Sequence, residues 1–249
     1  MKPEIIKVDS AASTNSLLAA RAAELGHGSV IVATAQTAGR GQRGNTWESE
    51  PGKNLTFSVL LRPEAIEARR QFELSMSVAL SLRDAIAALV GDAAEVTVKW
   101  PNDIYAGDRK ICGILIENTL SGKGITHSVV GAGVNINQRR FVSDAPNPVS
   151  VVMLTGHEHD LDTTMAEIAA RIVGDFDRYE IAPDPEALKT RYMSQLWRRD
   201  GFHPYRDAAT GEVFEAEIAD IDLAGPITLR RHDGTLGTYA FKEVAALLT

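Results

Sequence analysis

Residues 96–137 read VTVKWPNDIYAGDRKICGILIENTLSGKGITHSVVGAGVNIN, and their pattern indicates a run of neighbouring strands. It predicts a short strand at Val96–Trp100, a second at Ile104–Tyr105 and a long third strand at Lys110–Glu117. Ser121-Gly122-Lys123-Gly124 is a hairpin turn, so the next strand, Ile125–Asn137, runs back beside the third. A sheet with hairpin-joined strands is therefore expected in the middle of the chain.

Helices and further strands are expected on both sides of this stretch. From Phe72 to Leu89 apolar residues recur at a spacing of three and four, which predicts a helix with one buried face. Gly26 ends an earlier helix, and short apolar runs predict more strands. The expected elements are strands at 5–8, 29–33 and 55–61, and helices at 16–25, 72–89, 165–176 and 187–197.

The sequence after Gly201 contains short strands and no expected helix. The strands, at 213–218, 226–231 and 235–241, are separated by turns that contain aspartate and glycine. Such a run predicts a small β-barrel appended to a mixed α/β region. We therefore expect two units, a larger α/β unit at 1–200 and a barrel at 201–249.

Composition and charge narrow the class of protein. The chain has 249 residues, 44% of them hydrophobic, which is enough for a proper core. Its net charge of −7 argues against a general nucleic-acid binder, which needs a basic surface. Cys112 is the single cysteine, so no intramolecular disulfide can form. The N-terminus lacks the apolar run of a secretory signal, and no apolar run approaches the ~20 residues of a membrane span. We expect a cytoplasmic protein with no membrane partner.

A glycine-rich segment, Gly39-Arg40-Gly41-Gln42-Arg43-Gly44, matches the dinucleotide pattern but not its context. The pattern needs a helix after the last glycine, whereas Pro51 and Gly52 follow closely and a strand comes next. Asn45 stands where a phosphate loop has its lysine. What remains is a loop that carries arginines, suited to carboxylate or phosphate oxygens, and then Trp47. A surface loop with incidental arginines is the alternative.

A second motif, Lys99-Trp100-Pro101-Asn102-Asp103, ends a strand because proline cannot donate to a ladder. Lys110 begins the next long strand, so Lys99, Asp103 and Lys110 are expected to converge at one hairpin mouth. Taken alone, Lys99 and Asp103 fit a surface ion pair as well.

A third motif, Gly131-Ala132-Gly133-Val134-Asn135, places two glycines inside a strand. Such glycines usually mark close approach by a ligand or another backbone. By strand alternation Asn135 and Asn137 share one face. A glycine-bulged strand with two edge asparagines is the alternative.

Together, in this order, these motifs resemble those of the biotin–protein ligases. The resemblance covers roughly residues 5–249, and five ordered motifs are specific although each alone is weak or moderate. The motifs are Ser13-Thr14-Asn15, Gln36-Thr37-Ala38-Gly39-Arg40-Gly41 with Trp47, Lys99-Trp100-Pro101-Asn102-Asp103, Arg109-Lys110 with Gly113-Ile114-Leu115-Ile116-Glu117, and Gly131-Ala132-Gly133-Val134-Asn135.

The resemblance implies a fold and a reaction. The fold is a mixed sheet with helices packed on one side, as in class II synthetases, plus an SH3-like barrel at the C-terminus. The reaction joins biotin to one lysine of a biotin carboxyl carrier protein through biotinyl-5′-AMP. ATP with Mg²⁺ would be the cofactors and biotin the substrate.

The resemblance also implies roles for particular residues. The catalytic residues would be Lys110 and Arg40, which would neutralise the two anions, and Asp103, which would orient the acceptor lysine or a Mg²⁺ shell. Biotin would be bound by Ser13, Thr14, Asn15, Gln36, Gly39, Arg40, Lys110 and Gly113. The ATP or adenylate would be bound by Gly41, Gln42, Arg43, Trp47, Lys99, Asn102 and Asn135, and no protein metal ligand is assigned.

The chain departs from the family's pattern in its loop, where Gln42 and Asn45 replace arginines. Fewer positive charges over the phosphate predict faster loss of the adenylate. Ser13 follows only 12 residues, which leaves no room for the winged-helix domain of the repressor members.

Several rival functions and sites remain open at this stage. A lipoate–protein ligase and a non-catalytic biotin sensor are the competing functions. Cys112 alternates among apolar residues, which indicates packing rather than a nucleophile. His157 and His159 lack further ligands for a metal site.

Overall fold

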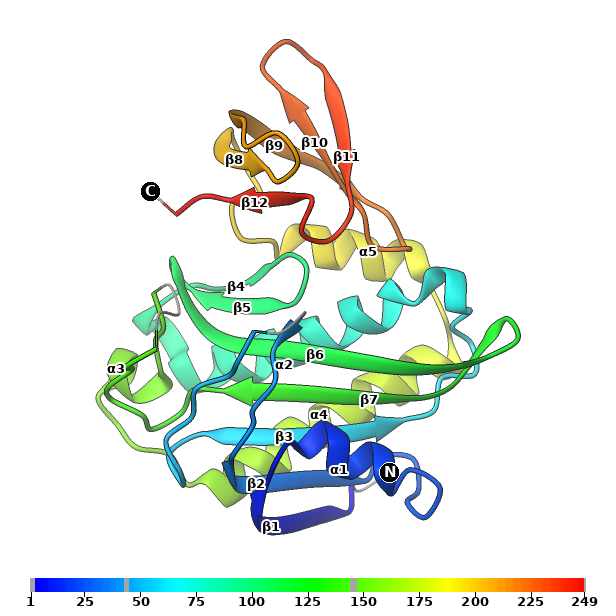
Figure 1. Cartoon of the computed structure of the whole chain (residues 1–249), viewed down its shortest axis with the longest axis vertical. Coiled ribbons are helices and arrows are strands. Elements are labelled where there is room, and N and C mark those ends of the chain that lie inside the picture. Colours follow the sequence, from blue (N-terminus) through cyan, green and yellow to red (C-terminus); the bar gives the residue numbers. More distant parts are fainter. Residues whose placement is uncertain (1–2, 43–44, 144–146, 249) are drawn as a thin grey trace.

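The computed structural model describes residues 3–42, 45–143 and 147–248. A mixed seven-stranded sheet forms the centre of the molecule (Figure 1), and its first two strands are parallel while all the other neighbours are antiparallel. Across the sheet the strands are β1 (Ile5–Ala11), β2 (Val30–Gln36), β3 (Leu55–Leu61), β7 (Gly124–Val134), β6 (Arg109–Ser121), β5 (Asp103–Ala106) and β4 (Val96–Lys99).

The stretch 96–137 forms β4 to β7 as successive antiparallel neighbours, as the sequence predicts. β7 ends at Val134, earlier than expected, because the following backbone pairs outside the sheet ladder. There the N–H of Asn135 donates to the carbonyl of Ile111, and the N–H of Asn137 donates to that of Lys53. These bonds replace a continued strand.

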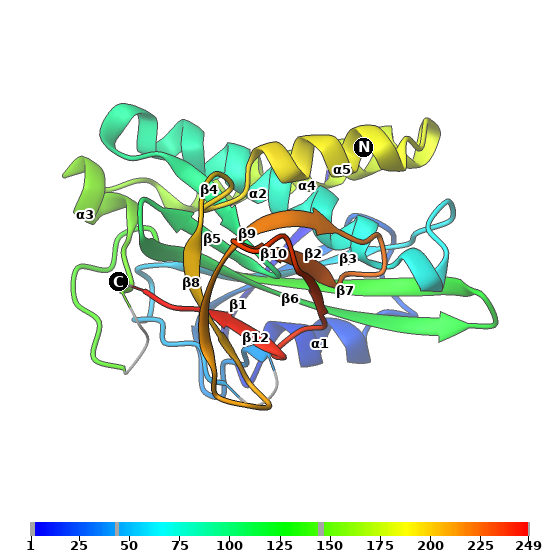
Figure 2. The same ribbon diagram turned by 90° about the horizontal axis from the view of Figure 1, so that it is seen from above.

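The long helices cover one face of this sheet, as expected. α2 (Phe72–Val90) and α4 (Leu161–Ile181) pack on it side by side, and α5 (Pro185–Ser194) lies against α2 (Figure 2). By length and composition alone, Phe72–Ala93 would pass as a membrane span, contrary to the sequence expectation. Here it is the core helix, with most of that window buried.

One short helix lies on the opposite face. α1 (Thr14–Ala20) begins two residues before the expected helix and ends five residues earlier (Figure 2). Leu18 packs there on Ile31, Leu60 and Val129, whose strand neighbours point to the larger core instead. Beside α1, residues of β6 and β7 line a cavity on this face of the sheet.

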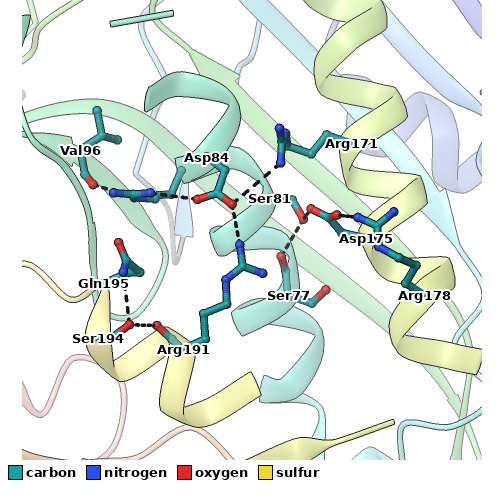
Figure 3. A network of polar contacts seen from close by, with 11 residues as sticks. Ser77, Ser81, Asp84, Val96, Arg171, Asp175, Arg178, Arg191, Ser194 and Gln195 are labelled. Carbon is teal, nitrogen blue, oxygen red and sulfur yellow. Dashed lines mark hydrogen bonds and ion pairs between the residues drawn. The ribbon is translucent and has the colours of Figure 1, made fainter. Parts of the chain in front are cut away.

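A carboxylate on α2 connects the three outer helices (Figure 3). Asp84 accepts from Arg83 and from Arg191 on α5 at 3.0 and 2.5 Å, and Arg171 on α4 lies 3.9 Å away. Its side chain is only 20% exposed. Helices that meet the sheet separately are therefore also joined to one another by charge.

The C-terminal region forms a second, antiparallel sheet. Its strands lie in the order β11 (Leu236–Tyr239), β10 (Ile227–Arg231), β9 (Val213–Ile221), β8 (His203–Asp207) and β12 (Val244–Ala246), consistent with a small barrel-like unit. β8 and β12 were not predicted, and neither was the short α3 (Val151–Thr155).

The second sheet is fixed to the first beside the β4–β5 hairpin. The indole N–H of Trp100 donates to the Gly225 carbonyl at 2.9 Å. The Phe241 ring lies against both Trp100 and Phe72, with centroids 5.4 and 5.6 Å apart. These contacts bring the C-terminal strands close to the residues that follow β4.

Candidate functional site

A cavity opens on the sheet face beside α1, under the glycine-rich loop. Segments far apart in the sequence line it: the start of α1, the end of β2, the loop itself, and β6 and β7. The predicted site residues that it collects are Ser13, Thr14, Asn15, Gln36, Arg40, Gly41, Gln42, Trp47, Asn102, Lys110 and Gly113.

Glycines make the floor of the cavity flat. A Cβ on Gly133 would lie 2.3 Å from the Trp47 ring, and one on Gly113 would lie 3.0 Å from it. A Cβ on Gly131 would lie 2.1 Å from Asn15 Oδ1. The glycine motif predicted close approach by a ligand or another backbone, and the groups that approach here are instead the side chains of Asn15 and Trp47. Trp47, expected beside the nucleotide, lies across this floor.

One end of the cavity is a network of neutral polar groups. The Ser58 hydroxyl lies 2.6 Å from Asn15 Oδ1 and 2.8 Å from Thr14 Oγ1, and all three residues are buried. The backbone N–H of Thr14 donates to Gln36 Oε1 at 2.8 Å. Ser13 precedes α1 without making a side-chain cap, so its hydroxyl is left for other partners.

Glu117 joins this network although sequence reasoning gave it no role. Its Oε2 accepts from Asn15 Nδ2 at 2.7 Å and from Arg40 at 2.8 Å. In the sequence, a role for Glu117 was indicated by its position at the end of the motif Gly113-Ile114-Leu115-Ile116-Glu117. For Ser58, also missed, the signal was a polar residue in a wholly buried strand.

The other end of the cavity carries charge. Lys110 Nζ lies 2.7 Å from Asp103 Oδ1, as an ion contact rather than an aligned hydrogen bond. The two side chains are 27% and 16% exposed. Asn102 is held beside them by its amide, which donates to the Ile114 carbonyl at 2.8 Å. The expected convergence of Asp103 and Lys110 is confirmed, and their roles stay predictions.

Lys99 faces a different cavity, between the β4–β5 hairpin and the C-terminal strands. Its ammonium lies 5.1 Å from the Tyr105 ring centroid and 5.9 Å from that of Trp197. Burial lowers the pKa of Lys99, and the attraction of nearby Asp103 offsets this only in part. Gln42 and Asn102 line both cavities, which therefore adjoin.

The glycine-rich loop is folded back on itself like a hairpin, where the sequence indicated no regular structure. The N–H of Gly41 donates to the Asn45 carbonyl, and that of Trp47 donates to the Gly39 carbonyl. Gly39 does not line the cavity but allows this closure, since a Cβ there would lie 2.8 Å from the Trp47 carbonyl oxygen. Arg43 lies outside the described residues.

Two predicted site residues make contacts other than those expected, and Cys112 packs in the core as predicted. Asn135 is 2% exposed and donates to the Val149 carbonyl at 3.0 Å, behind the cavity rather than in its lining. Arg40 contacts Glu117, not the Lys110 end. Cys112 is buried, and burial raises the pKa of its thiol, which supports packing rather than nucleophilic chemistry.

No metal centre is apparent in the described part of the chain. Within residues 3–42, 45–143 and 147–248, no three His, Cys, Asp or Glu side chains are grouped to hold an ion. His159 is fixed through its backbone, whose N–H donates to Asn137 Oδ1.

Comparisons with known proteins agree with this geometry. The model of the biotin/lipoate A/B protein ligase family matches residues 6–135, just over half of the chain. The biotin–[acetyl-CoA-carboxylase] ligase of Paracoccus denitrificans is 36% identical over 186 residues, covering 72% of this chain and 77% of that protein. The bifunctional ligase/repressor BirA of Escherichia coli is 39% identical over 193 residues, covering 78% of this chain and 54% of BirA.

Solved structures share the fold over nearly the whole chain. The biotin protein ligase of Aquifex aeolicus in complex with biotin and ATP aligns with a TM-score of 0.80 at 22% identity, covering 99% of each chain. The Leishmania major biotin protein ligase with biotinyl-5-AMP aligns with a TM-score of 0.67 at 21% identity, covering 95% of this chain and 98% of that one. The chain belongs to the biotin/lipoate A/B protein ligase family.

Proposed function

We propose that this chain is an ATP-dependent biotin–protein ligase. The observation that carries the proposal is one cavity with hydroxyl and amide groups at one end and a lysine at the other end. Biotin has the same division, since its ureido ring is neutral and polar and its side chain ends in a carboxylate.

The cavity suits each part of biotin in turn. Ser13, Thr14 and Gln36 offer hydroxyl and amide groups to the ureido ring. Trp47 and Ile114 provide apolar surface for the thioether ring and the aliphatic chain. Lys110 would then meet the carboxylate. A pocket of mostly apolar surface with a few placed polar groups is the usual form of a small-molecule site.

In the first step, a carboxylate oxygen of biotin attacks the α-phosphorus of ATP. The bond from that phosphorus to the bridging oxygen breaks, and pyrophosphate leaves with the electron pair. Two anions must meet here, so a fixed cation stabilises the transition state more than the separated reactants. Lys110 is the described cation at this end, and Asp103 holds its ammonium in place.

In the second step, the neutral amine of the acceptor lysine attacks the acyl carbon. An amide bond forms, AMP leaves, and the amine loses its proton. Asp103 lines the adjoining cavity and contacts Lys110, and from there it would orient that amine. The loop over the cavity would exclude water, which otherwise hydrolyses the mixed anhydride.

Mg²⁺ would enter with the nucleotide. The described residues provide no cage of three ligands, so the ion is expected to be held mainly by phosphate oxygens, with Asp103 available to complete its shell. Bound there, Mg²⁺ would neutralise phosphate charge. Arg40 contacts Glu117 at the polar end of the cavity. In this position it would contribute to the biotin-ring site and to the loop rather than to the Lys110 end.

The polar end favours biotin over lipoate. The dithiolane ring of lipoate has no N–H or C=O groups, so it could not form the hydrogen bonds that Ser13, Thr14 and Gln36 offer to the ureido ring. A site built to hydrogen-bond its ligand rejects an analogue that lacks those groups strongly. The names of the relatives support the same choice, and we propose a biotin carboxyl carrier protein as acceptor and the cytoplasm as location.

Biotin-dependent exchange of labelled pyrophosphate into ATP tests the first step. Wild type should catalyse the exchange with biotin and not with lipoate, and Lys110→Ala should lower the rate by at least about a hundredfold. Tight biotin binding without any exchange would instead identify a biotin sensor, and exchange with lipoate alone would identify a lipoate ligase.

A further inference from the structure

Lys99 is a partly buried amine that neither proposed reaction step uses. It lies at the end of β4, directly opposite Asp103 in the β4–β5 hairpin. Both side chains line the cavity between this hairpin and the C-terminal strands. Asp103 also contacts Lys110 at 2.7 Å. Asp103 therefore links the cavity of Lys99 to the end of the biotin cavity where the adenylate is expected.

The surroundings of Lys99 are mostly aromatic and apolar. Its ammonium lies 5.1 Å from the ring centroid of Tyr105 and 5.9 Å from that of Trp197. Within the described part of the chain, it makes no ion pair with a carboxylate. The cavity wall near it also contains Trp100, Tyr205, Ile218, Ile227, Phe241 and Val244.

Charged groups on three neighbouring segments act on Lys99. Burial lowers the pKa of Lys99, the attraction of Asp103 on β5 opposes this, and two cations, Lys110 on β6 and Arg198 before β8, lower it further. More of this side chain is therefore a neutral amine near neutral pH than is usual for an exposed lysine. The other titratable side chains beside Lys99 or in the cavity wall are Tyr105, Tyr205 and Lys242.

The transfer step releases a proton where an acceptor lysine would meet these groups. The acceptor nitrogen bonds the acyl carbon and becomes positively charged, the bond from that carbon to the phosphate oxygen breaks, and AMP leaves with the electron pair. Loss of a proton from the nitrogen completes the amide. Asp103 is already paired with Lys110, so it is placed to orient the nitrogen rather than to take this proton. A neutral amine is also a stronger base than a carboxylate.

We propose that Lys99 is a catalytic residue of the transfer step, in which its neutral amine takes the proton from the attacking acceptor nitrogen. The ammonium that forms is stabilised by the nearby Asp103 carboxylate and by the faces of the Tyr105 and Trp197 rings. It returns the proton to solvent after the products leave. The inference rests on the proposed function and deepens it.

Single-turnover transfer from preformed biotinyl-AMP to a biotin carboxyl carrier domain isolates this step. Lys99→Met should slow the transfer about a hundredfold at pH 7. Lys99→Arg should slow it similarly, because a guanidinium keeps the charge but cannot be deprotonated. Pyrophosphate exchange, which involves no acceptor, should fall far less in both variants. Lys123→Met, in the exposed turn between β6 and β7, is the control and should transfer at the wild-type rate.

The pH dependence separates proton transfer from packing or simple charge. Dividing the wild-type rate by the Lys99→Met rate cancels the titration of the acceptor's own lysine. This ratio should change between pH 6 and pH 10, the range in which Lys99 titrates.

Restoring an amine at position 99 provides a rescue. Lys99→Cys treated with 2-bromoethylamine carries a lysine analogue with sulfur in its chain, and mass spectrometry confirms the modification. Transfer should recover in the treated variant. Wild type treated in the same way is the control, because its single cysteine, Cys112, is buried.

Wild-type transfer by Lys99→Arg, a rate ratio that stayed constant from pH 6 to pH 10, or no rescue by the restored amine would overturn the role of Lys99. The proposed function fails separately, and would do so if wild type catalysed no biotin-dependent pyrophosphate exchange.

Discussion

Glycines at three positions set how closely side chains approach the cavity floor. Gly131 is the most demanding, because a Cβ there would lie 2.1 Å from Asn15 Oδ1 and 3.0 Å from Asn15 Nδ2. Asn15 cannot retreat easily, since Ser58 and Glu117 hold it on two sides. The absence of a side chain at Gly131 therefore leaves room for Asn15 at the polar end of the cavity, and this is its role rather than making β7 flexible.

Gly131→Ala should weaken biotin binding more than tenfold and lower the free energy of unfolding by about 1–3 kcal/mol through overpacking. Gly174→Ala on α4 is the control, since its Cβ would make only an ordinary 3.6 Å contact. It should add up to ~1 kcal/mol of stability. Calorimetry and urea unfolding measure both; unchanged binding in Gly131→Ala would mean that Asn15 does not set the pocket.

Lys99 should make stability depend on pH in the alkaline range. Burial lowers its pKa, so the folded protein binds this proton less tightly than the unfolded chain does. The resulting penalty is full below the folded-state pKa and disappears as the pH rises through that value toward ~10.4. Lys99→Met should therefore stabilise the protein at pH 7, with an advantage that shrinks toward pH 10.

Urea unfolding from pH 7 to 10 tests this, with Lys123→Met in the exposed hairpin turn as the control. An advantage for Lys99→Met that grew with pH would contradict the assigned sign.

At the residue scale, sequence predicted the cavity's members better than their partners. The motifs located eleven predicted residues that now line one cavity. They did not reveal Ser58 or Glu117. These two residues matter because they contact Asn15, which is distant from both of them in the sequence. They also did not place Lys99 in the adjoining cavity, because strand alternation gives a face and not the neighbour that covers it.

Among the structural elements, the glycine-rich loop is the one expected to control how fast the biotinyl-AMP intermediate is released. Gln42 borders all three cavities that meet beside Asn102, at a position where the family resemblance implies arginine. Gln42→Arg adds a cation near the expected phosphate and should slow release of free biotinyl-AMP several-fold. Gln42→Glu should accelerate release. Chromatography of released adenylate in the absence of acceptor measures both, and equal rates in the two variants would exclude a role for loop charge.

The helical layer should depend on Asp84. Asp84→Ala leaves arginines from α2, α4 and α5 without their shared, mostly buried partner (Figure 3). The expected cost is about 1–3 kcal/mol of unfolding free energy. Asp200→Ala, which removes an exposed pair with Arg199, should leave the free energy of unfolding nearly unchanged. Equal losses in urea unfolding would mean that the Asp84 cluster adds nothing beyond a surface pair.

Elements with strong periodicity were predictable and those defined by tertiary partners were not. β3 matches its expected bounds, and α2 extends its expected range by one residue. β8 contains Pro204 and charged residues, and β12 has three residues. β8 acquires its strand form by pairing with β9 and β12, and β12 by pairing with β8. α1 ends at Ala20, where the chain turns, so the helix is shorter than predicted. The apolar side chains of Ala22 and Leu25 still pack on the sheet.

At the scale of the whole molecule, the proposed mechanism depends on the position of the C-terminal sheet beside the central sheet. The Lys110–Asp103 end of the biotin cavity adjoins the cavity beneath the C-terminal strands, where Phe241 and Trp100 meet. An acceptor lysine that entered between the two sheets would reach the end of the site where the adenylate is expected. Sequence alone predicted both units but could not predict this junction, because it depends on contacts between segments more than 100 residues apart.

Transfer of labelled biotin to a biotin carboxyl carrier domain would show whether this chain is a biotin–protein ligase. Wild type should label the carrier's acceptor lysine in the presence of ATP, excess lipoate should not compete, and Lys110→Ala should abolish labelling while remaining folded. Tight biotin binding with no transfer by wild type, or full transfer by Lys110→Ala, would contradict the account.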